Sequence, residues 1–356
     1  MGFTRIRSYH FRNLQDEEIS LGNAREIFLV GQNGQGKTNF LEALYLLCYG
    51  SSFRTKNDKQ LCRWGSPHFS LQGDFTREGE THTAGLKVTE DEKTFLWDRE
   101  PVRDRKEMVQ QMPCVAFTHE DYLFVQGTPE HQRFFFDQTL SLYDASYIDT
   151  LRQYRKLLKT RNLLLSSDPG GALPVWEEQM ISKGLELVAS RHRLIEEFNE
   201  VFPELFATVS GLEKLEIRYR SSWKGSYQDL IQQLEESRAK ERETGYSTTG
   251  PHRDRYIFTL DGRDFAQTAS TGQVRLVSLL LRTAQARFSA RKTGKLPLLL
   301  FDDVLLELDG EKRQRFLSQL PSAEQAFFTY LPEEHPNGSD DPLILRVQNG
   351  RFEKNG

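Results

Sequence analysis

One segment near the amino terminus constrains the fold of this chain more than any other. Residues 31–38 read GQNGQGKT and fit G-x-x-x-x-G-K-[ST], the pattern of a phosphate-binding loop. Its glycines let backbone N–H groups approach phosphates, its lysine reaches the β and γ phosphates, and its last hydroxyl reaches Mg²⁺. The pattern predicts an ATP site whose contacts are Gly31, Asn33, Gly34, Gln35, Gly36, Lys37 and Thr38, with Thr38 also a metal ligand.

The residues on either side of this segment have the character that such a loop requires. Residues 26–30 (EIFLV) are typical of a short buried strand, and the apolar stretch that starts at Asn39 is typical of a helix. The loop therefore leads into a helix N-terminus, where the helix dipole favours bound anions. The alternative is a glycine turn that precedes a core helix by chance, and the strand and helix in their expected places disfavour it.

Length and composition indicate a large protein that builds its own core. The 356 residues suit one large domain or two. No apolar run reaches the ~18 residues of a membrane span, and no apolar segment of a signal peptide follows the N-terminus. The three cysteines are scattered, which argues against disulfides and zinc and favours a reducing cytoplasm. Because the net charge is −4, any contact with DNA needs a local basic patch.

Hydrophobic periodicity divides the chain into three parts. Apolar residues recur at helical spacing over 146–165 and again over about 175–202, with a turn sequence at 166–171 between them, which predicts an antiparallel helical hairpin. Strand-like segments flank it, and residues 343–352 predict a hairpin on an Asn-Gly turn. Residues 333–342 are polar and predict a loop. We expect an α/β fold: a P-loop ATPase head built from residues 1–125 and 211–356, with a helical arm at 126–210.

A second acidic motif completes the predicted nucleotide site. Residues 298–303 (LLLFDD) are typical of an apolar strand that ends in two acids. In phosphate-loop ATPases the acid at this position holds Mg²⁺, which we assign to Asp302, and the next acid orients the attacking water, which we assign to Asp303. The alternative is a buried strand with solvated acids at its end.

A polar motif, Ser270-Thr271-Gly272-Gln273, opens a long apolar helix that starts at Val274. It offers a second anion site, which one nucleotide held by the phosphate loop does not need. The economical interpretation is that Ser270, Gly272 and Gln273 contact the nucleotide of another subunit. A simple helix cap is the alternative.

Basic residues gather on one face of the predicted first arm helix. Arg152, Arg155, Lys156 and Lys159 lie three or four positions apart, with Arg161 nearby, and are candidates for contact with DNA phosphates. A solvated helix face is the alternative.

Further short motifs narrow the interpretation. The chain carries His10-Phe11-Arg12-Asn13, Ser52-Phe53-Arg54, Phe117-Thr118-His119-Glu120-Asp121 and Thr249-Gly250-Pro251-His252-Arg253-Asp254. With the phosphate loop, the acidic strand and the Ser270 motif, the chain resembles the ABC/SMC class of ATPase heads and, more closely, the RecF family of recombinational DNA-repair proteins. Tyr330 and Gln126 are among the positions that depart from the family pattern or stay open. Tyr330 follows Thr329 where the family tends to have Thr, and Gln126 is either the Mg²⁺-coordinating loop glutamine or a surface residue.

The resemblance implies an ATP-dependent DNA-binding protein. Such a protein forms a homodimer on ATP, hydrolyses it weakly with Mg²⁺ and stimulation by DNA, and acts at DNA gaps. RecR- and RecO-type partners and the recombinase RecA are implied with it. Two other classes share part of the pattern: the ATPase subunit of an ABC-type transporter, which leaves the long helical insertion unexplained, and a phosphate-loop kinase or scaffold, which does not need the Ser270 motif.

Overall fold

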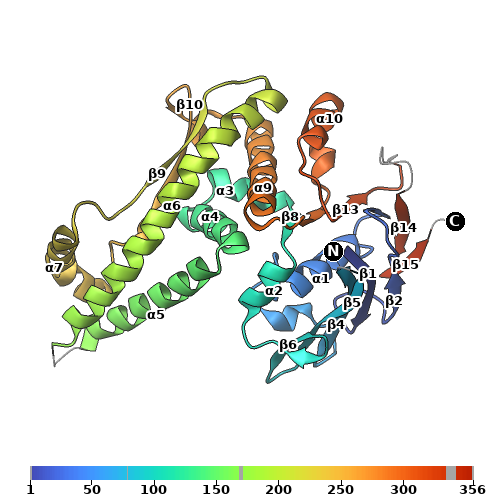
Figure 1. Ribbon diagram of the computed structural model, residues 1–356, viewed down its shortest axis with the longest axis horizontal. Helices are drawn as coiled ribbons and strands as arrows, with labels where there is room; N and C mark the ends of the chain where they lie inside the picture. Colours follow the sequence, from blue (N-terminus) through green and yellow to red (C-terminus); the bar gives the residue numbers. More distant parts are fainter. Residues whose placement is uncertain (1, 78, 168–170, 334–341, 355–356) are drawn as a thin grey trace. The chain divides into compact units, whose positions relative to one another are not determined.

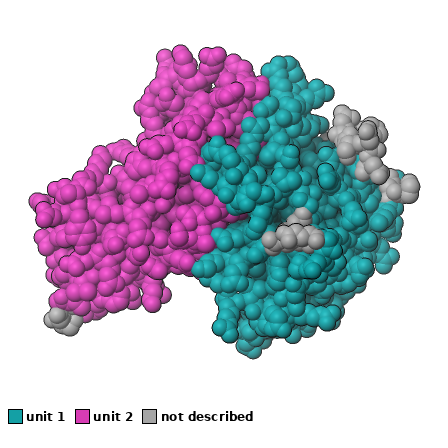
Figure 2. Space-filling model, viewed as in Figure 1, with its two compact units in different colours: residues 1–120, 285–356 teal, residues 121–284 magenta. Residues whose placement is uncertain are grey.

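A computed structural model describes residues 2–77, 79–167, 171–333 and 342–354, which form two compact units (Figure 2). Unit 1 combines residues 1–120 with residues 285–356, and unit 2 is the segment 121–284 between them. Residues 168–170 of the predicted turn and 334–341 of the predicted loop lie outside the described residues. Unit 1 thus draws on both ends of the chain, and unit 2 is one continuous insertion.

One sheet of unit 1 has six strands in the order β15-β14-β3-β13-β12-β8. Its strands are β3 (Glu26–Val30), β8 (Cys114–Phe117), β12 (Leu298–Phe301), β13 (Gln325–Tyr330), β14 (Leu343–Gln348) and β15 (Arg351–Lys354). Figure 1 labels β8, β13, β14 and β15 of this sheet. All neighbours are parallel except β15, which pairs antiparallel with β14 across the predicted Asn-Gly turn. Since parallel strands end at one edge, the residues that follow β3, β12 and β13 meet there.

A second, antiparallel sheet of unit 1 has the order β2-β1-β4-β5-β6-β7. Its strands are β1 (Gly2–Tyr9), β2 (Glu18–Ser20), β4 (Phe69–Arg77), β5 (Glu80–Val88), β6 (Lys93–Trp97) and β7 (Glu100–Pro101). Helix α1 (Lys37–Tyr49) contacts β4 and β5 of this sheet and β8 and β13 of the parallel sheet, and nearly all its residues are buried. A helix that is apolar around its whole circumference has to be buried in this way. The phosphate loop is therefore anchored by the core element of unit 1.

Smaller helices complete unit 1. They are α2 (Arg105–Gln111), α10 (Gly310–Ser318) and the 3-10 turns η1 (Asp58–Leu61) and η4 (Val304–Glu307). Two elements, η2 (His119–Tyr122) and α9 (Thr271–Thr293), contain the positions at which the chain passes between the units.

Unit 2 is mostly helical. Its helices are α3 (Leu123–Gln126), α4 (Pro129–Tyr143), α5 (Ala145–Ser167), α6 (Leu173–Ser210), α7 (Tyr227–Thr244) and α8 (Phe265–Thr268), with the 3-10 turn η3 (Pro251–Arg253). Helices α5 and α6 pack against each other, as the predicted hairpin requires. Strands β9 (Leu215–Arg220), β10 (Arg255–Leu260) and β11 (Arg263–Asp264) form an antiparallel sheet in the order β11-β10-β9. Within the described part of the chain, no helix combines the length and the apolar character needed to cross a membrane.

The extent of the insertion differs from the predicted one. We expected the arm to end at 210 and residues 211–356 to belong to the head, whereas the compact unit runs on to Ala284. The reason is tertiary pairing, because β9 packs against α6 and pairs along its whole length with β10, and α7 packs against α5 and α6. Residues 211–284 therefore belong with the arm helices.

Candidate functional site

The predicted phosphate loop lies between β3 and α1 in unit 1. Gly36, which precedes the first helical residue, has a φ of 119°, a conformation that L side chains rarely adopt. A Cβ on Gly31 would lie 2.3 Å from the Val347 carbonyl oxygen of β14. The helix has no side-chain cap, so its first N–H groups face the loop. A cavity of about 230 Å³ opens there, lined by Asn33, Gly34, Gly36, Lys37, Thr38, Asn39, Arg54 and Asp303.

The lysine of the loop is held inside it. Lys37 is only 4% exposed, and its Nζ donates to the carbonyl oxygens of Gly31 at 2.5 Å and Gln32 at 3.3 Å. Its ammonium charge is thereby placed at the wall of the cavity. A charge fixed in this position favours a polyphosphate chain in the same space.

The two acids that follow β12 lie next to the loop, although more than 260 positions separate them from it in sequence. Thr38 Oγ1 donates to Asp302 Oδ1 at 2.6 Å. Asp303 has a left-handed φ of 55°, and its side chain accepts from Thr329 Oγ1 at 2.6 Å. Thr329 lies on β13 and also accepts from the Asp303 backbone N–H at 2.7 Å. Three parallel strand ends therefore assemble one polar cluster.

The environment of Asp302 affects its protonation. Burial raises the pKa of its carboxyl to about 6, and the neighbouring charge of Asp303 adds to the rise, against the hydrogen bond from Thr38. A divalent cation would favour the ionised form. The described residues contain no cluster of three or more His, Cys, Asp or Glu that could hold a metal alone. A hydroxyl and one carboxylate fit Mg²⁺, which in nucleotide sites takes its remaining ligands from phosphates and water.

A buried glutamate explains the Ser52-Phe53-Arg54 motif. Glu42 of α1 is fully buried and accepts from Arg12 at 2.9 and 3.0 Å and from Ser52 Oγ at 2.5 Å. Arg54 lies 3.4 Å from the same carboxylate and donates to Asn39 Oδ1 at 2.8 Å. Arg54 and Asn39 both line the phosphate cavity, and neither was among the predicted nucleotide contacts. A lone acid within an otherwise apolar helix was the signal that could have located them.

The Ser270 motif lies in unit 2 and forms the N-terminus of α9. The Ser270 backbone N–H donates to Gln273 Oε1 at 2.8 Å, and Ser270 Oγ accepts from the Gln273 backbone N–H at 3.3 Å. This reciprocal pair is a capping box, the alternative named above. Ser270 and Gly272 are both exposed, and a Cβ on Gly272 would meet no atom within 4 Å. The N-terminus of α9 is therefore accessible from solvent.

Comparison with known proteins identifies the family. The family described as "RecF/RecN/SMC N terminal domain" matches residues 3–352. The "DNA replication and repair protein RecF" of Treponema pallidum (strain Nichols) is 41% identical over 331 residues, which are 92% of this chain and 94% of that protein. The protein of the same name from Chlamydia caviae is 31% identical over 355 residues, 98% of this chain and 96% of that protein. The chain belongs to the RecF family.

Solved structures agree with this assignment. "Structure of the recombination mediator protein RecF-ATP in RecFOR pathway" matches with a TM-score of 0.90 and 25% identity, over 99% of this chain and 97% of that one. A crystal structure of the SmcHead bound to the C-winged helix domain of ScpA matches with a TM-score of 0.58 and 14% identity, over 99% of this chain and 96% of that one, and so shows the fold alone. The predicted α/β, ABC/SMC-type ATPase head with a helical arm is thereby confirmed.

In this RecF-family chain the predicted basic residues of α5 are solvent-accessible. Arg152, Arg155, Lys156 and Lys159, here called the α5 basic set, are all exposed. Arg155 pairs with Asp137 at 3.9 Å and Arg152 with Asp149 at 3.8 Å, yet the two arginine side chains stay 65% and 46% exposed, so their charges face solvent. Arg161, counted with them in the sequence, is different because it is fully buried.

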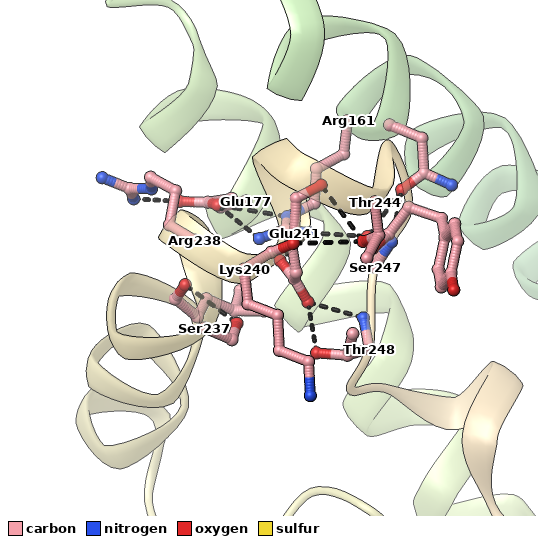
Figure 3. A network of polar contacts seen from close by, with 12 residues as sticks. Arg161, Glu177, Ser237, Arg238, Lys240, Glu241, Thr244, Ser247 and Thr248 are labelled. Atoms are coloured by element: carbon pink, nitrogen blue, oxygen red, sulfur yellow. Dashed lines mark hydrogen bonds and ion pairs between the residues drawn. The ribbon is translucent and has the colours of Figure 1, made fainter.

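Arg161 is the centre of the network drawn in Figure 3. Its guanidinium lies 2.9 Å from Glu177 and 2.7 Å from Glu241, and it donates to Ser247 Oγ at 2.6 Å. Burial opposes the ionisation of Glu241, but hydrogen bonds from Thr248 and the Arg161 charge hold its pKa below the usual value. Arg161 therefore joins α5 to α6 and α7 and is not available to a ligand.

The Thr249–Asp254 motif of the family also holds unit 2 together. Asp254 is fully buried and accepts from Arg191 at 3.1 Å and from the Ser222 backbone at 2.8 Å. Burial lowers the pKa of His252 to about 4, so the ring is neutral near pH 7. Its Nε2–H donates to the Ser247 carbonyl at 3.0 Å, and its Nδ1 accepts from the Tyr154 hydroxyl at 2.8 Å. The motif thus joins α5 and α6 to the start of β10 through a neutral histidine and a buried ion pair between Asp254 and Arg191. Gln126, the open candidate for a loop glutamine, donates to the Ala266 carbonyl at 3.0 Å in the same unit.

Proposed function

We propose that this chain is an ATP-dependent DNA-repair protein that binds ATP at residues 31–38 of unit 1. The observation that carries the proposal is the 2.6 Å contact between Thr38 of the loop and Asp302 of β12, in a chain whose family match spans residues 3–352. The RecF-ATP structure, which aligns over nearly the whole chain, supports ATP as the nucleotide.

In this proposal the residues of the polar cluster have separate roles in binding and hydrolysing ATP. Thr38 and Asp302 would hold Mg²⁺, and Lys37 places its charge on the β and γ phosphates. Bound at these two residues, Mg²⁺ would neutralise phosphate charge. Asp303 orients the attacking water, and its contact with Thr329 at 2.6 Å fixes the direction of its carboxylate. Hydrolysis is slow, and DNA stimulates it.

The second half of the site comes from another copy of the chain. Ser270, Gly272 and Gln273 of one subunit contact the γ-phosphate held by its partner, so that ATP links two chains into a homodimer. An exposed helix N-terminus with a small residue at Gly272 supports this role. Because the nucleotide forms part of the interface, the dimer is lost when the γ-phosphate is lost.

DNA lies along the α5 basic set, and the dimer presents two such surfaces at once. Relatives carry the name "DNA replication and repair protein RecF", and the ATP-bound structure places its protein in the RecFOR pathway, which supports duplex or gapped DNA as substrate. RecR- and RecO-type mediators and the recombinase RecA are the proposed partners, in the cytoplasm. The protein then helps to load recombinase at gaps.

Sedimentation velocity with ATP, ADP or no nucleotide, each with and without gapped duplex DNA, tests the proposal. We expect a dimer with ATP but not with ADP or without nucleotide, and a DNA complex that depends on ATP. In a parallel ATPase assay we expect turnover to rise when DNA is added. The Lys37→Met variant is the control, because it keeps the core of α1 and loses the phosphate contact. An ATP-induced dimer that binds no DNA and whose ATP turnover does not change with DNA would favour the transporter-type or another non-DNA ATPase. ATP binding by Lys37→Met at wild-type strength would refute the loop assignment itself.

A further inference from the structure

The three-stranded sheet of unit 2 has a buried face and an exposed face. Side chains alternate between the two faces along each strand, and those of β9 and β10 on the buried face are Leu215, Ile217, Tyr256 and Phe258. The other face carries Glu216, Arg218 and Arg220 of β9 and Arg255, Ile257 and Thr259 of β10. Its three arginines, here called the sheet arginines, are all exposed.

The register of the strands places like charges opposite each other. Arg255 is the direct cross-strand partner of Arg220 in the antiparallel pair of β10 with β9. The Cβ atoms of such partners lie about 4.5–5.5 Å apart, and like charges in this arrangement destabilise a sheet. Arg218 is the diagonal neighbour of Arg255 on the same face, at about 7–8 Å. The sheet therefore concentrates positive charge at the expense of its own stability.

The acids of unit 2 do little to offset this charge. Arg218 lies 3.2 Å from Glu216, but both side chains are more than half exposed, and exposed pairs of this kind contribute little. Among the residues that the structure describes, neither Arg220 nor Arg255 forms an ion pair. These two guanidinium groups are available to an anion from outside the chain.

A buried carboxylate fixes the backbone that carries this pair. Asp254, directly before Arg255, pairs with Arg191 at 3.1 Å and accepts from the Ser222 backbone N–H at 2.8 Å. Ser222 lies two residues after Arg220, so one side chain ties together the ends of both strands. Groups held on a rigid support lose less entropy when they bind a ligand.

The composition of the exposed face indicates the ligand. Guanidinium groups bind phosphate oxygens through paired hydrogen bonds. The six residues of this face include no aromatic side chain, which proteins that bind single strands use to stack bases. Ile257, partly buried, is the only large apolar residue among them, whereas the centre of a protein interface is apolar. The backbone of duplex DNA, with its regular phosphates, matches this face best.

We propose that the exposed face of β9 and β10 is a second DNA surface of unit 2, at which the sheet arginines contact the phosphates of a duplex. This inference rests on the proposed function, since it assigns a further contact to the same DNA substrate. The surface belongs to elements other than α5 and acts in addition to the α5 basic set. Because its contacts are to the backbone, it binds duplexes of any sequence.

Fluorescence anisotropy of a labelled duplex, titrated with the full chain, Mg²⁺ and ATP over a series of salt concentrations, tests this assignment. The Tm of each variant is measured in parallel without DNA. Arg255→Asp places a carboxylate opposite Arg220, so that the like-charge pair becomes an ion pair and the Tm should equal or exceed that of the wild type. Its duplex affinity should fall, and log K should depend less on log salt by about two, one for each arginine withdrawn.

Two further variants separate the surface from general effects. Arg255→Gln removes one charge and adds no partner, so its salt slope should be shallower by about one. It also decides the case in which Arg255→Asp does not fold. Arg263→Asp is the matched control, because it makes the same change of charge at an exposed position of β11 that opposes Leu260 and so lies on the other face. It should leave the slope unchanged.

Two results would overturn the inference. One is an unaltered slope in Arg255→Gln when the wild type binds the duplex, which would leave an acidic protein as the ligand of this face. The other is an equal loss in Arg263→Asp, which would mean that only the net charge matters. A wild-type chain that dimerises with ATP and binds no duplex would instead refute the DNA part of the proposed function, so the two failures are distinguishable.

Discussion

Replacing Asp302 by Asn should affect the ligand-free protein and the nucleotide complex in opposite directions. Burial and the nearby Asp303 raise the pKa of the Asp302 carboxyl from its ordinary value of 3.8 to about 6. That rise corresponds to about 3 kcal/mol, which the ionised carboxylate costs the folded protein above pH 6. Asn keeps the oxygen that accepts from Thr38 and carries no charge to desolvate.

The sign of the pH dependence follows from proton linkage. The folded chain holds the Asp302 proton up to about pH 6, whereas the unfolded chain releases it near 3.8. The free energy of unfolding of the wild type therefore falls as the pH rises through this range. We expect Asp302→Asn to be more stable than the wild type without ligand, by a margin that grows with pH and reaches at most about 3 kcal/mol near neutrality.

Thermal unfolding by calorimetry near pH 5 and pH 7.5, with and without Mg²⁺ and ATP, measures both effects. Glu90→Gln, at an exposed acid in the turn between β5 and β6, is the control for charge removal alone. Mg²⁺ with ATP should raise the Tm of the wild type and of Glu90→Gln, and should raise that of Asp302→Asn much less. A margin that fails to grow with pH would refute the burial argument. Full stabilisation of Asp302→Asn by Mg²⁺ and ATP would remove Asp302 from the metal site.

Four further changes test the remaining assignments. Asp303→Asn should bind ATP and dimerise but turn over at least tenfold more slowly, which corresponds to an activation free energy higher by at least ~1.4 kcal/mol. Unchanged turnover in a steady-state assay would exclude Asp303 from the chemistry. Ser270→Arg should bind ATP nearly normally and remain monomeric in sedimentation with ATP, whereas a persisting dimer would leave the motif as a helix cap only. Alanine at all four positions of the α5 basic set should weaken duplex binding and make log K less dependent on log salt by about one for each lost phosphate contact. An unaltered slope would move the DNA surface to unit 1, where Arg54, Arg103 and Arg105 are exposed basic residues. Arg161→Ala should destabilise unit 2 by about 3–5 kcal/mol in chemical unfolding, because it removes the buried guanidinium that pairs with Glu241 and leaves Glu177 with Arg238 alone. A loss below about 1 kcal/mol would contradict the network in Figure 3.

Local chemistry was readable from the sequence. The phosphate loop requires its glycines, lysine and threonine at fixed spacing within eight residues, so the motif specifies its own backbone geometry. The paired arm helices appear at Ala145–Ser167 and Leu173–Ser210, where periodicity predicted 146–165 and about 175–202. Asn349 and Gly350 both have positive φ, as the predicted Asn-Gly hairpin demands. Each of these features depends on residues close together in the chain.

Features that depend on distant pairing were decided by the tertiary structure. Arg161 has the same helical spacing as the α5 basic set, and only the packing of α6 and α7 around it turns a predicted surface charge into a buried ion pair. Likewise, β9 pairs with β10 although α7 lies between them in the sequence. This pairing keeps residues beyond 210 in unit 2, which ends at 284 and not at the predicted 210. Arg54 becomes part of the phosphate cavity because Glu42 and Asn39 of α1 hold it there. The sequence alone determined which groups this chain possesses and how each short segment folds, whereas burial and strand register, which no short segment contains, decided which of those groups meet.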